Sequence, residues 1–220
     1  MSAEAEAREE ARPRSHGGRP SRSESAQLSD RILDVATGLF LGQGFGATSI
    51  EAVAKHAGIS KRTFYHRFRG KEALFEAAVR RLVQRWTPAL DTALFEAPSL
   101  AASLRRLGEH MLDAALTPEA LALHRMMIAE GARFPALARI LHELGAAAGI
   151  ERIAGHLDAS IACGEIRALD TRFAAEQFIN LVITGPRRRA LGLGPPVHPS
   201  ELRPWVEQTV SLFLDGCRAK

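Results

Sequence analysis

Two short helices separated by a tight glycine turn constrain the fold more than any other part of this sequence. Thr48 begins a capping box, because its hydroxyl can cap a helix start while Glu51 reaches back to its backbone N–H. Gly58 supplies the left-handed residue that ends this helix, and Ser60 is a fresh N-cap two positions later. This pattern is typical of a helix-turn-helix unit. The two predicted helices cover residues 49–57 and 61–66.

The rest of the chain also favours helix. Only 6% of its 220 residues are aromatic, Ala, Leu and Arg recur throughout, and runs of Val, Ile and Thr are scarce. Apolar residues recur at helical spacing between start and stop signals, so the sequence predicts an all-α protein. The further predicted helices run from Leu28 to Gly42, from Lys71 to Pro88, and over residues 99–116, 118–132, 135–163, 171–185 and 200–216.

The excess positive charge of the chain is concentrated in one segment. Residues 29–87 hold ten Lys or Arg against five Asp or Glu, whereas residues 1–28 sum to zero and residues 88–220 to minus 1. A basic segment joined to a near-neutral one is the electrostatic footprint of a small nucleic-acid-binding domain. A purely structural helical protein would explain the helices but not this asymmetry.

Residues 1–27 lack apolar periodicity and predict a disordered arm. Its first half is acidic and its second half is basic, through Arg12, Arg14, Arg19 and Arg22. The arm is either a solvated tail or a segment that contacts DNA. No apolar stretch is long enough for a membrane span and no signal peptide is evident, so we expect a cytoplasmic protein with no membrane partner.

Residues for catalysis or metal binding are not arranged in any recognisable motif. Cys163 and Cys217 lack the spacing of a zinc or redox site, and two inert thiols explain them better than a redox switch. Histidines after His66 never pair at helical spacing, so we expect neither a metal nor a cofactor. The sequence also contains no GxSxG motif and no Gly-rich phosphate loop, so we expect no enzyme.

The second helix of the pair has two contrasting faces. Phe64 and Phe68 lie four residues apart and can anchor it to the helices before it. A DNA-reading helix must expose polar and basic groups on its other face. His66 could instead be a metal ligand or a core residue, but the basic side chains around it would repel a cation. The residues of this helix that remain available to the DNA groove and its walls are Lys61, Arg62, Tyr65, His66 and Arg67.

The segment from Ile32 to Phe75, above all TSIEAVAKHAGISKRTFYHRFRGKEALF, resembles the DNA-binding domain of the TetR family. Later segments, LHRMMIAEGARFPALARILHELG and GPRRRALG, resemble the AefR-like type of C-terminal domain. One departure is that Arg67 stands where many members carry His. The resemblance implies an N-terminal three-helix helix-turn-helix domain and a C-terminal helical domain for ligand binding and dimerisation. The predicted divisions are residues 1–27, 28–75 and 76–220.

The resemblance also implies residue roles and a function. The protein would be a transcriptional repressor that binds a palindromic double-stranded DNA operator as a homodimer. An unknown small-molecule effector would release it from the operator. Thr48 is either only a cap or also a phosphate contact, and Lys71 opposes the dipole of its own helix start, which a bound phosphate would explain. The implied DNA contacts are Thr48, Ser60, Lys61, Arg62, Thr63, Tyr65, His66, Arg67 and Lys71.

Two further sets of residues lie in the C-terminal part. The first falls in helices that enclose the effector cavity in the resembled family, although each member could be ordinary core, and the neighbouring Arg125 could bind an acidic effector or face water. These candidates are Trp86, Met111, His124, Met126, Met127 and Phe134. The second set forms broad apolar faces on the last two helices, which we expect to pair across a dimer axis. It comprises Phe173, Phe178, Leu181, Val182, Trp205, Val206, Thr209, Val210 and Phe213.

Overall fold

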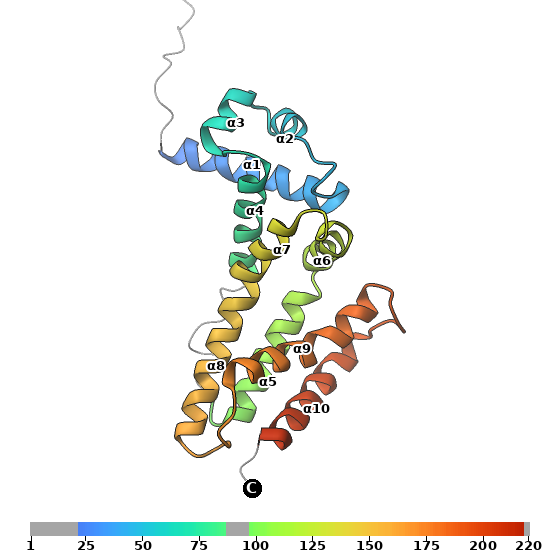
Figure 1. Cartoon of the computed structure of the whole chain (residues 1–220). Coiled ribbons are helices and arrows are strands. Elements are labelled where there is room, and N and C mark those ends of the chain that lie inside the picture. Colours follow the sequence, from blue (N-terminus) through green and yellow to red (C-terminus); the bar gives the residue numbers. More distant parts are fainter. Residues whose placement is uncertain (1–21, 87–96, 218–220) are drawn as a thin grey trace, which may run out of the picture.

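The structure, a computed structural model, describes residues 22–86 and 97–217. These residues are mostly helical and contain no strand, which confirms the all-α prediction. The first four helices form a compact head, and α4 descends from it towards the remaining helices (Figure 1). The helices of this part are α1 (Arg22–Gln43), α2 (Ile50–Ala57), α3 (Lys61–Arg67) and α4 (Lys71–Trp86).

The C-terminal part is a bundle in which α8 packs on α9, α9 on α10, and α5 on both α9 and α10 (Figure 1). The long helix predicted over residues 135–163 is three consecutive elements, because a π-helical turn interrupts its hydrogen bonding. The last two helices are found close to their predicted positions, although α9 continues through Pro186. The elements are α5 (Leu100–Ala115), α6 (Pro118–Glu130), α7 (Pro135–Leu141), η2 (His142–Ala146), α8 (Ala147–Ala162), α9 (Thr171–Ala190) and α10 (Pro199–Cys217).

The buried apolar side chains form two clusters, and the first does not end with the helix-turn-helix unit. It joins α1 to α4 with residues of α6 and α7, among them Leu123, Met126, Leu137 and Ile140. The second cluster fills the bundle of α5, α8, α9 and α10. Helices α6 and α7 therefore pack on the head and connect it to the bundle.

Helix α1 begins at Arg22, six residues before the predicted start at Leu28. The Arg67 guanidinium donates hydrogen bonds to the Ser25 carbonyl at 3.1 Å and to the Ser29 hydroxyl at 2.7 Å. These bonds fasten the first turns of α1 to α3 and explain why the helix extends into the expected arm. The prediction of disorder is thus wrong for residues 22–27, and the remainder of that arm lies outside the described residues.

The predicted capping box at Thr48 is also wrong. Ser49 is the N-cap of α2, and its hydroxyl accepts a hydrogen bond from the Ala52 N–H at 3.0 Å. Thr48 is buried, and its hydroxyl donates to the Gly44 carbonyl at 2.7 Å. Gly44 adopts a positive φ of 91°, and this turn brings its carbonyl back towards Thr48. With two adjacent residues able to cap, the turn before them decides which one does so.

The turn between α2 and α3 is as predicted. Gly58 has a φ of 65°, and its N–H closes the C-terminal end of α2 on the Lys55 carbonyl. The Ser60 hydroxyl accepts from the Thr63 N–H at 3.1 Å and caps α3. Within the described ranges, no helix is both long enough and apolar enough to cross a membrane.

Candidate functional site

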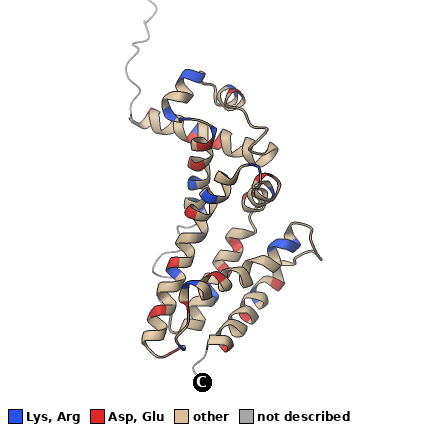
Figure 2. Ribbon diagram, in the orientation of Figure 1, with Lys and Arg blue, Asp and Glu red and all other residues tan. Residues whose placement is uncertain are grey.

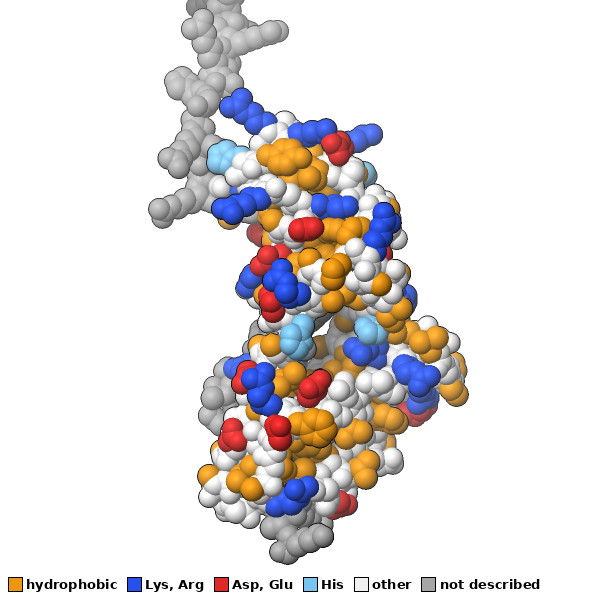
Figure 3. All heavy atoms as spheres, in the orientation of Figure 1, with side chains coloured by type: hydrophobic (Ala, Val, Ile, Leu, Met, Phe, Trp, Pro, Cys, Tyr) orange, Lys and Arg blue, Asp and Glu red, His pale blue; other side chains and the backbone are white. Residues whose placement is uncertain are grey.

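Helix α3 presents a polar, exposed face at the outer end of the head. Phe64 is fully buried and Phe68 is half-buried beside it, with ring centroids 5.6 Å apart. Tyr65 is 55% exposed and lies edge-on to Phe64 at 5.4 Å. Basic residues mark α3 in Figure 2, and basic and apolar side chains mingle at this end of the surface in Figure 3. Phe64 and Phe68 thus fix α3 so that its other face points outward.

Four of the nine predicted DNA contacts share this outward face. They are Lys61, Arg62, Tyr65 and His66, and all four are exposed. Lys61 bonds Glu51 of α2 at 2.5 Å, and this pair lowers the pKa of Glu51 and raises that of Lys61. Both partners are more than half exposed, so the pair is weak and can open when a phosphate approaches. No carboxylate in the described part of the chain forms an ion pair with Arg62.

The other five predicted contacts hold the head together. Ser60 caps α3, and its hydroxyl lies 2.9 Å from that of Thr63. Thr48 is buried, and Arg67 fastens α1 to α3. Sequence could not reveal the Arg67 bond, because the Ser25 carbonyl is a main-chain group 42 residues away. The Gly44 carbonyl that satisfies Thr48 is only four residues away, but its direction depends on the turn at Gly44.

Lys71, the fifth of these, fastens the loop between α1 and α2 to the start of α4. Its ammonium donates to the Phe45 carbonyl at 2.8 Å and to the Gly46 carbonyl at 3.3 Å, and it lies 4.5 Å from the centroid of the Phe45 ring. These partners explain a cation at a helix start without a phosphate. An ammonium carries three N–H groups, so the two loop carbonyls leave one for another acceptor.

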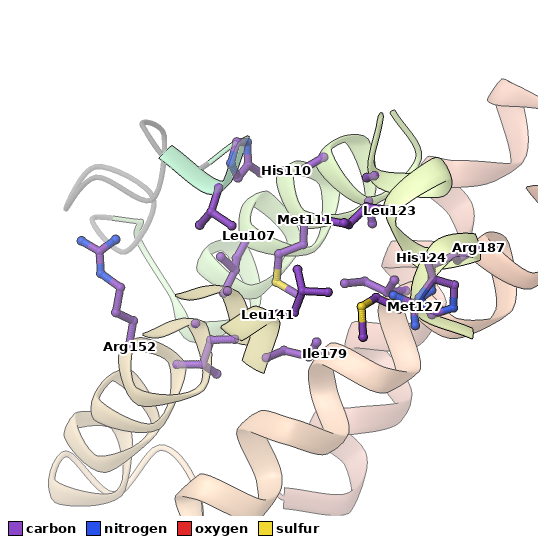
Figure 4. Close-up of a pocket in the computed structure, with 18 residues that line it drawn as sticks. Leu107, His110, Met111, Leu123, His124, Met127, Leu141, Arg152, Ile179 and Arg187 are labelled. Atoms are coloured by element: carbon purple, nitrogen blue, oxygen red, sulfur yellow. The ribbon is translucent and has the colours of Figure 1, made fainter. Parts of the chain in front are cut away.

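A cavity of about 370 Å³ lies where α5, α6, α8 and α9 meet below the head. Its walls are mainly apolar, and Figure 3 shows histidine side chains at the rim of a hollow in this region. Among the predicted effector residues, Met111, His124 and Met127 line it (Figure 4). This volume falls within the range of small-molecule sites, roughly 300–1,000 Å³.

Two of the remaining effector predictions, Met126 and Phe134, do not line the cavity. Met126 is buried in the first core cluster, because neighbouring positions on a helix point about 100° apart and Met127 takes the cavity side. Phe134 packs edge-on against Phe45 of the head with ring centroids 4.9 Å apart. The side chain of Trp86 lies outside the described residues.

Three basic residues line the cavity and were missed from the sequence. His110 is on α5, Arg152 on α8 and Arg187 on α9. The sequence did contain one indication for Arg187. Three consecutive arginines, residues 187–189, cannot all face water when their helix is packed against others. Figure 4 shows Arg187 and His124 together at one end of the cavity, with Arg152 at the opposite end.

The predicted dimer faces are mostly covered within the subunit. Helices α5 and α8 pack over them, and Phe178 meets Phe213 at 5.2 Å between ring centroids. The expectation that these faces need a partner chain is therefore wrong for Phe178, Val182, Val206, Thr209, Val210 and Phe213.

The outward side of α9 and α10 carries fewer apolar side chains than expected. Phe173 and Leu181 remain exposed, as does Leu212, which was not predicted. Trp205 is half-buried and donates its indole N–H to the Val182 carbonyl at 2.9 Å. Three large apolar side chains on one outward pair of helices still mark a surface that water solvates poorly.

Within the described ranges, no group of three or more His, Cys, Asp or Glu side chains is arranged to hold a metal ion. Cys163 is exposed and Cys217 is buried, and both are free thiols. Burial raises the pKa of Cys217, which disfavours its reactive thiolate.

Two family models match this chain. The model described as "Bacterial regulatory proteins, tetR family" matches residues 32–78. The model described as "AefR-like transcriptional repressor, C-terminal domain" matches residues 102–217, which is more than half of the chain. The matched regions contain α3 and the cavity-lining helices, respectively.

Solved structures extend the similarity over most of the chain. A TetR-family transcriptional regulator from Mesorhizobium loti superposes with a TM-score of 0.76 and 27% identity, covering 91% of this chain and 100% of that one. The flavonoid-responsive regulator FrrA superposes with a TM-score of 0.75 and 32% identity, covering 89% and 99%.

Curated relatives match only in the N-terminal part. The transcriptional repressor KstR2 of Mycolicibacterium smegmatis is 33% identical over 75 residues, 32% of this chain and 37% of that protein. The transcriptional regulator UidR of Escherichia coli is 39% identical over 57 residues, 26% and 29% of the two chains. The chain thus matches well under half the length of these relatives.

Proposed function

The chain belongs to the TetR family and is a DNA-binding transcriptional regulator, not an enzyme, and from this premise we propose that it is an effector-controlled repressor. It binds a palindromic operator as a homodimer and leaves it when a small molecule occupies the cavity. Because such a protein acts on chromosomal DNA, we propose a cytoplasmic location for it.

The observation that carries the DNA-binding proposal is that α3 has one apolar, packed face and one polar, exposed face. Buried Phe64 and half-buried Phe68 hold the helix, while Lys61, Arg62, Tyr65 and His66 project outward from its exposed face. A recognition helix needs this arrangement, because its exposed side must reach base edges and phosphates in the major groove. Lys71 retains one N–H for a phosphate, so it is kept among the proposed contacts.

Operator binding is tested by selection from random duplexes with the purified full-length protein. One helix-turn-helix unit covers one half-site, so a two-fold dimer should enrich an inverted repeat. The two halves should be separated by about one helical turn of DNA, or a multiple of it. Enrichment of a single unrepeated half-site would contradict the dimeric proposal, and enrichment of no sequence would contradict operator recognition.

Arg62→Ala should weaken operator binding and make its salt dependence shallower by about one released ion. Arg62 is exposed on the outward face of α3 without an ion-pair partner among the described residues, so its charge is available to DNA. Binding isotherms at four salt concentrations give the slope. Arg105→Ala is the matched control, because Arg105 is an exposed arginine on α5 and should leave the slope unchanged. An unaltered slope for Arg62→Ala would remove this residue from the DNA contacts.

Dimerisation through α9 and α10 is supported by the outward side chains of Phe173, Leu181 and Leu212. Pairing these helices across a two-fold axis would make a four-helix bundle and bury all three. The same axis would set the distance between the two copies of α3.

Effector control is supported by the position of the cavity on α6. His124 and Met127 of this helix line the cavity, and Glu130, one turn later, accepts a hydrogen bond from the Gly46 N–H of the head at 2.5 Å. A ligand that displaces α6 therefore acts on the loop before α2. Release from DNA requires only that the ligand bind the two positions of α6 with different affinity.

A further inference from the structure

Arg187 is a half-buried cation on the wall of a mainly apolar cavity. Burial lowers its pKa, yet a guanidinium remains protonated in proteins, so the positive charge stays at the cavity wall. Leaving a charge partly removed from water is costly unless an opposite charge or hydrogen-bond acceptors compensate it. The structure should therefore supply a partner for this guanidinium.

No such partner exists among the described residues. No carboxylate there lies within 4.0 Å of the Arg187 guanidinium, and no hydrogen bond to it is present. Other arginines of α9 are satisfied: Arg189 bonds Glu201 at 2.7 Å and Arg172 bonds Glu151 at 2.8 Å. Arg187 is thus a cation of α9 that is partly buried in the bundle and has neither a carboxylate nor a hydrogen-bond acceptor as partner among the described residues.

A second basic side chain lies at the same end of the cavity. His124 on α6 points to the same region as Arg187 (Figure 4). Burial, followed by the charge of Arg187, lowers the pKa of His124, so this imidazole is neutral at pH 7 and can donate or accept a hydrogen bond. This end of the cavity therefore offers one full positive charge and one neutral polar group. The other walls are mainly apolar, apart from His110 on α5 and the exposed Arg152 at the opposite end.

We propose that the effector is an amphipathic monoanion, with a carboxylate bound to Arg187 and an apolar body against Leu107, Met111, Met127 and Ile179. This inference rests on the proposed effector site and adds the chemistry of its ligand. One guanidinium balances one negative charge and matches the two oxygens of a carboxylate, which it can bind in a bidentate manner. A cationic ligand would be repelled by Arg187, and a neutral ligand would bury the guanidinium further without a counter-ion.

Three ten-carbon probes with different head groups test the proposal on the full-length protein. Decanoate, decan-1-ol and decylamine share their apolar body and differ in charge at pH 7.5. We expect decanoate to bind at least about tenfold more tightly than either other probe, because a hydrogen bond between ionised groups is stronger than one to a neutral group. Isothermal titration calorimetry measures the three dissociation constants. Decanol binding as tightly as decanoate, or no decanoate binding at millimolar concentration, would overturn the proposal.

Arg187→Gln localises the effect to one side chain. The variant should lose about tenfold or more in decanoate affinity, while its decanol affinity stays within about threefold. Arg188→Gln is the matched control, because it removes an exposed arginine from the next position of α9 and should change neither affinity. Equal losses for decanoate and decanol in Arg187→Gln would contradict a carboxylate contact. The wild-type comparison keeps the proposal testable if this variant fails to fold.

Operator binding separates this inference from the proposed function. If decanoate binds through Arg187 but leaves operator affinity unchanged, the anion site stands and effector-controlled release is contradicted. If a neutral ligand releases the operator and decanoate does not bind, release stands and the monoanion proposal is overturned.

Discussion

Leu181→Glu is expected to produce a folded monomer whose operator affinity is reduced by more than about 100-fold. Leu181 is 41% exposed on α9, so the new carboxylate changes the surface and not the subunit core. Two-fold symmetry would place two such carboxylates in one interface. An unpaired charge buried there costs about 3–5 kcal/mol, and about 1.4 kcal/mol corresponds to each tenfold change.

Light scattering coupled to size-exclusion chromatography measures the mass, and titration of a labelled operator measures affinity. Ile128→Glu is the matched control, because Ile128 is 65% exposed on α6, away from the proposed interface, and should leave both properties unchanged. Val210→Glu should behave differently again, because Val210 is only 1% exposed inside its own subunit and a charge there unfolds the bundle. A Leu181→Glu protein that remains dimeric would contradict the use of this face.

Elements encoded by adjacent residues were predicted well from the sequence. Gly58 and Ser60 end one helix and begin the next through bonds that span only a few residues, so their positions determine the turn. Phe64 was placed inward because helical spacing puts it on the same side as Phe68, and both rings do contact each other. Local chemistry was sufficient for the turn between α2 and α3 because its hydrogen bonds span only a few residues.

Partners that come from distant segments were not predictable in the same way. Arg67 has Ser25 as its partner and Lys71 has Phe45, and a basic side chain near α3 looks the same in sequence whether its acceptor is a main-chain carbonyl or a phosphate. Val210 shows that the partner of an apolar helix face is equally hard to predict from the sequence. Its periodicity identified a face that must be buried, but not whether α5 of the same subunit or a second subunit covers it.

The contact between α6 and the head is the most specific link between the cavity and the DNA-proximal helices. The Glu130 carboxylate accepts from the Gly46 N–H at 2.5 Å, while Lys71 holds the carbonyls of Phe45 and Gly46 from the α4 side. Phe134, just after α6, packs on Phe45. The short loop between α1 and α2 is thus held between the helix that lines the cavity and the helix that follows α3.

Glu130→Ala is expected to leave operator binding and decanoate binding in place while removing most of the effect of one ligand on the other. The substitution deletes the acceptor of the Gly46 N–H, so movement of α6 no longer pulls on the loop. Couplings of this kind are typically about 5–150-fold in affinity, and by linkage the factor is the same in both directions. In Glu130→Ala the decanoate affinities of the free and the operator-bound protein should therefore converge.

Glu130→Gln is the matched control, because it removes the charge and keeps an oxygen that can accept from Gly46. It should retain most of the coupling if the hydrogen bond carries it, whereas equal losses in both variants would assign the coupling to charge. The measurement is the decanoate dissociation constant with and without saturating operator, and the operator dissociation constant with and without decanoate. Full coupling in Glu130→Ala would show that α6 acts on the head through apolar contacts, those of Leu123 and Met126 and of the adjacent Phe134 with Phe45, and not through this hydrogen bond.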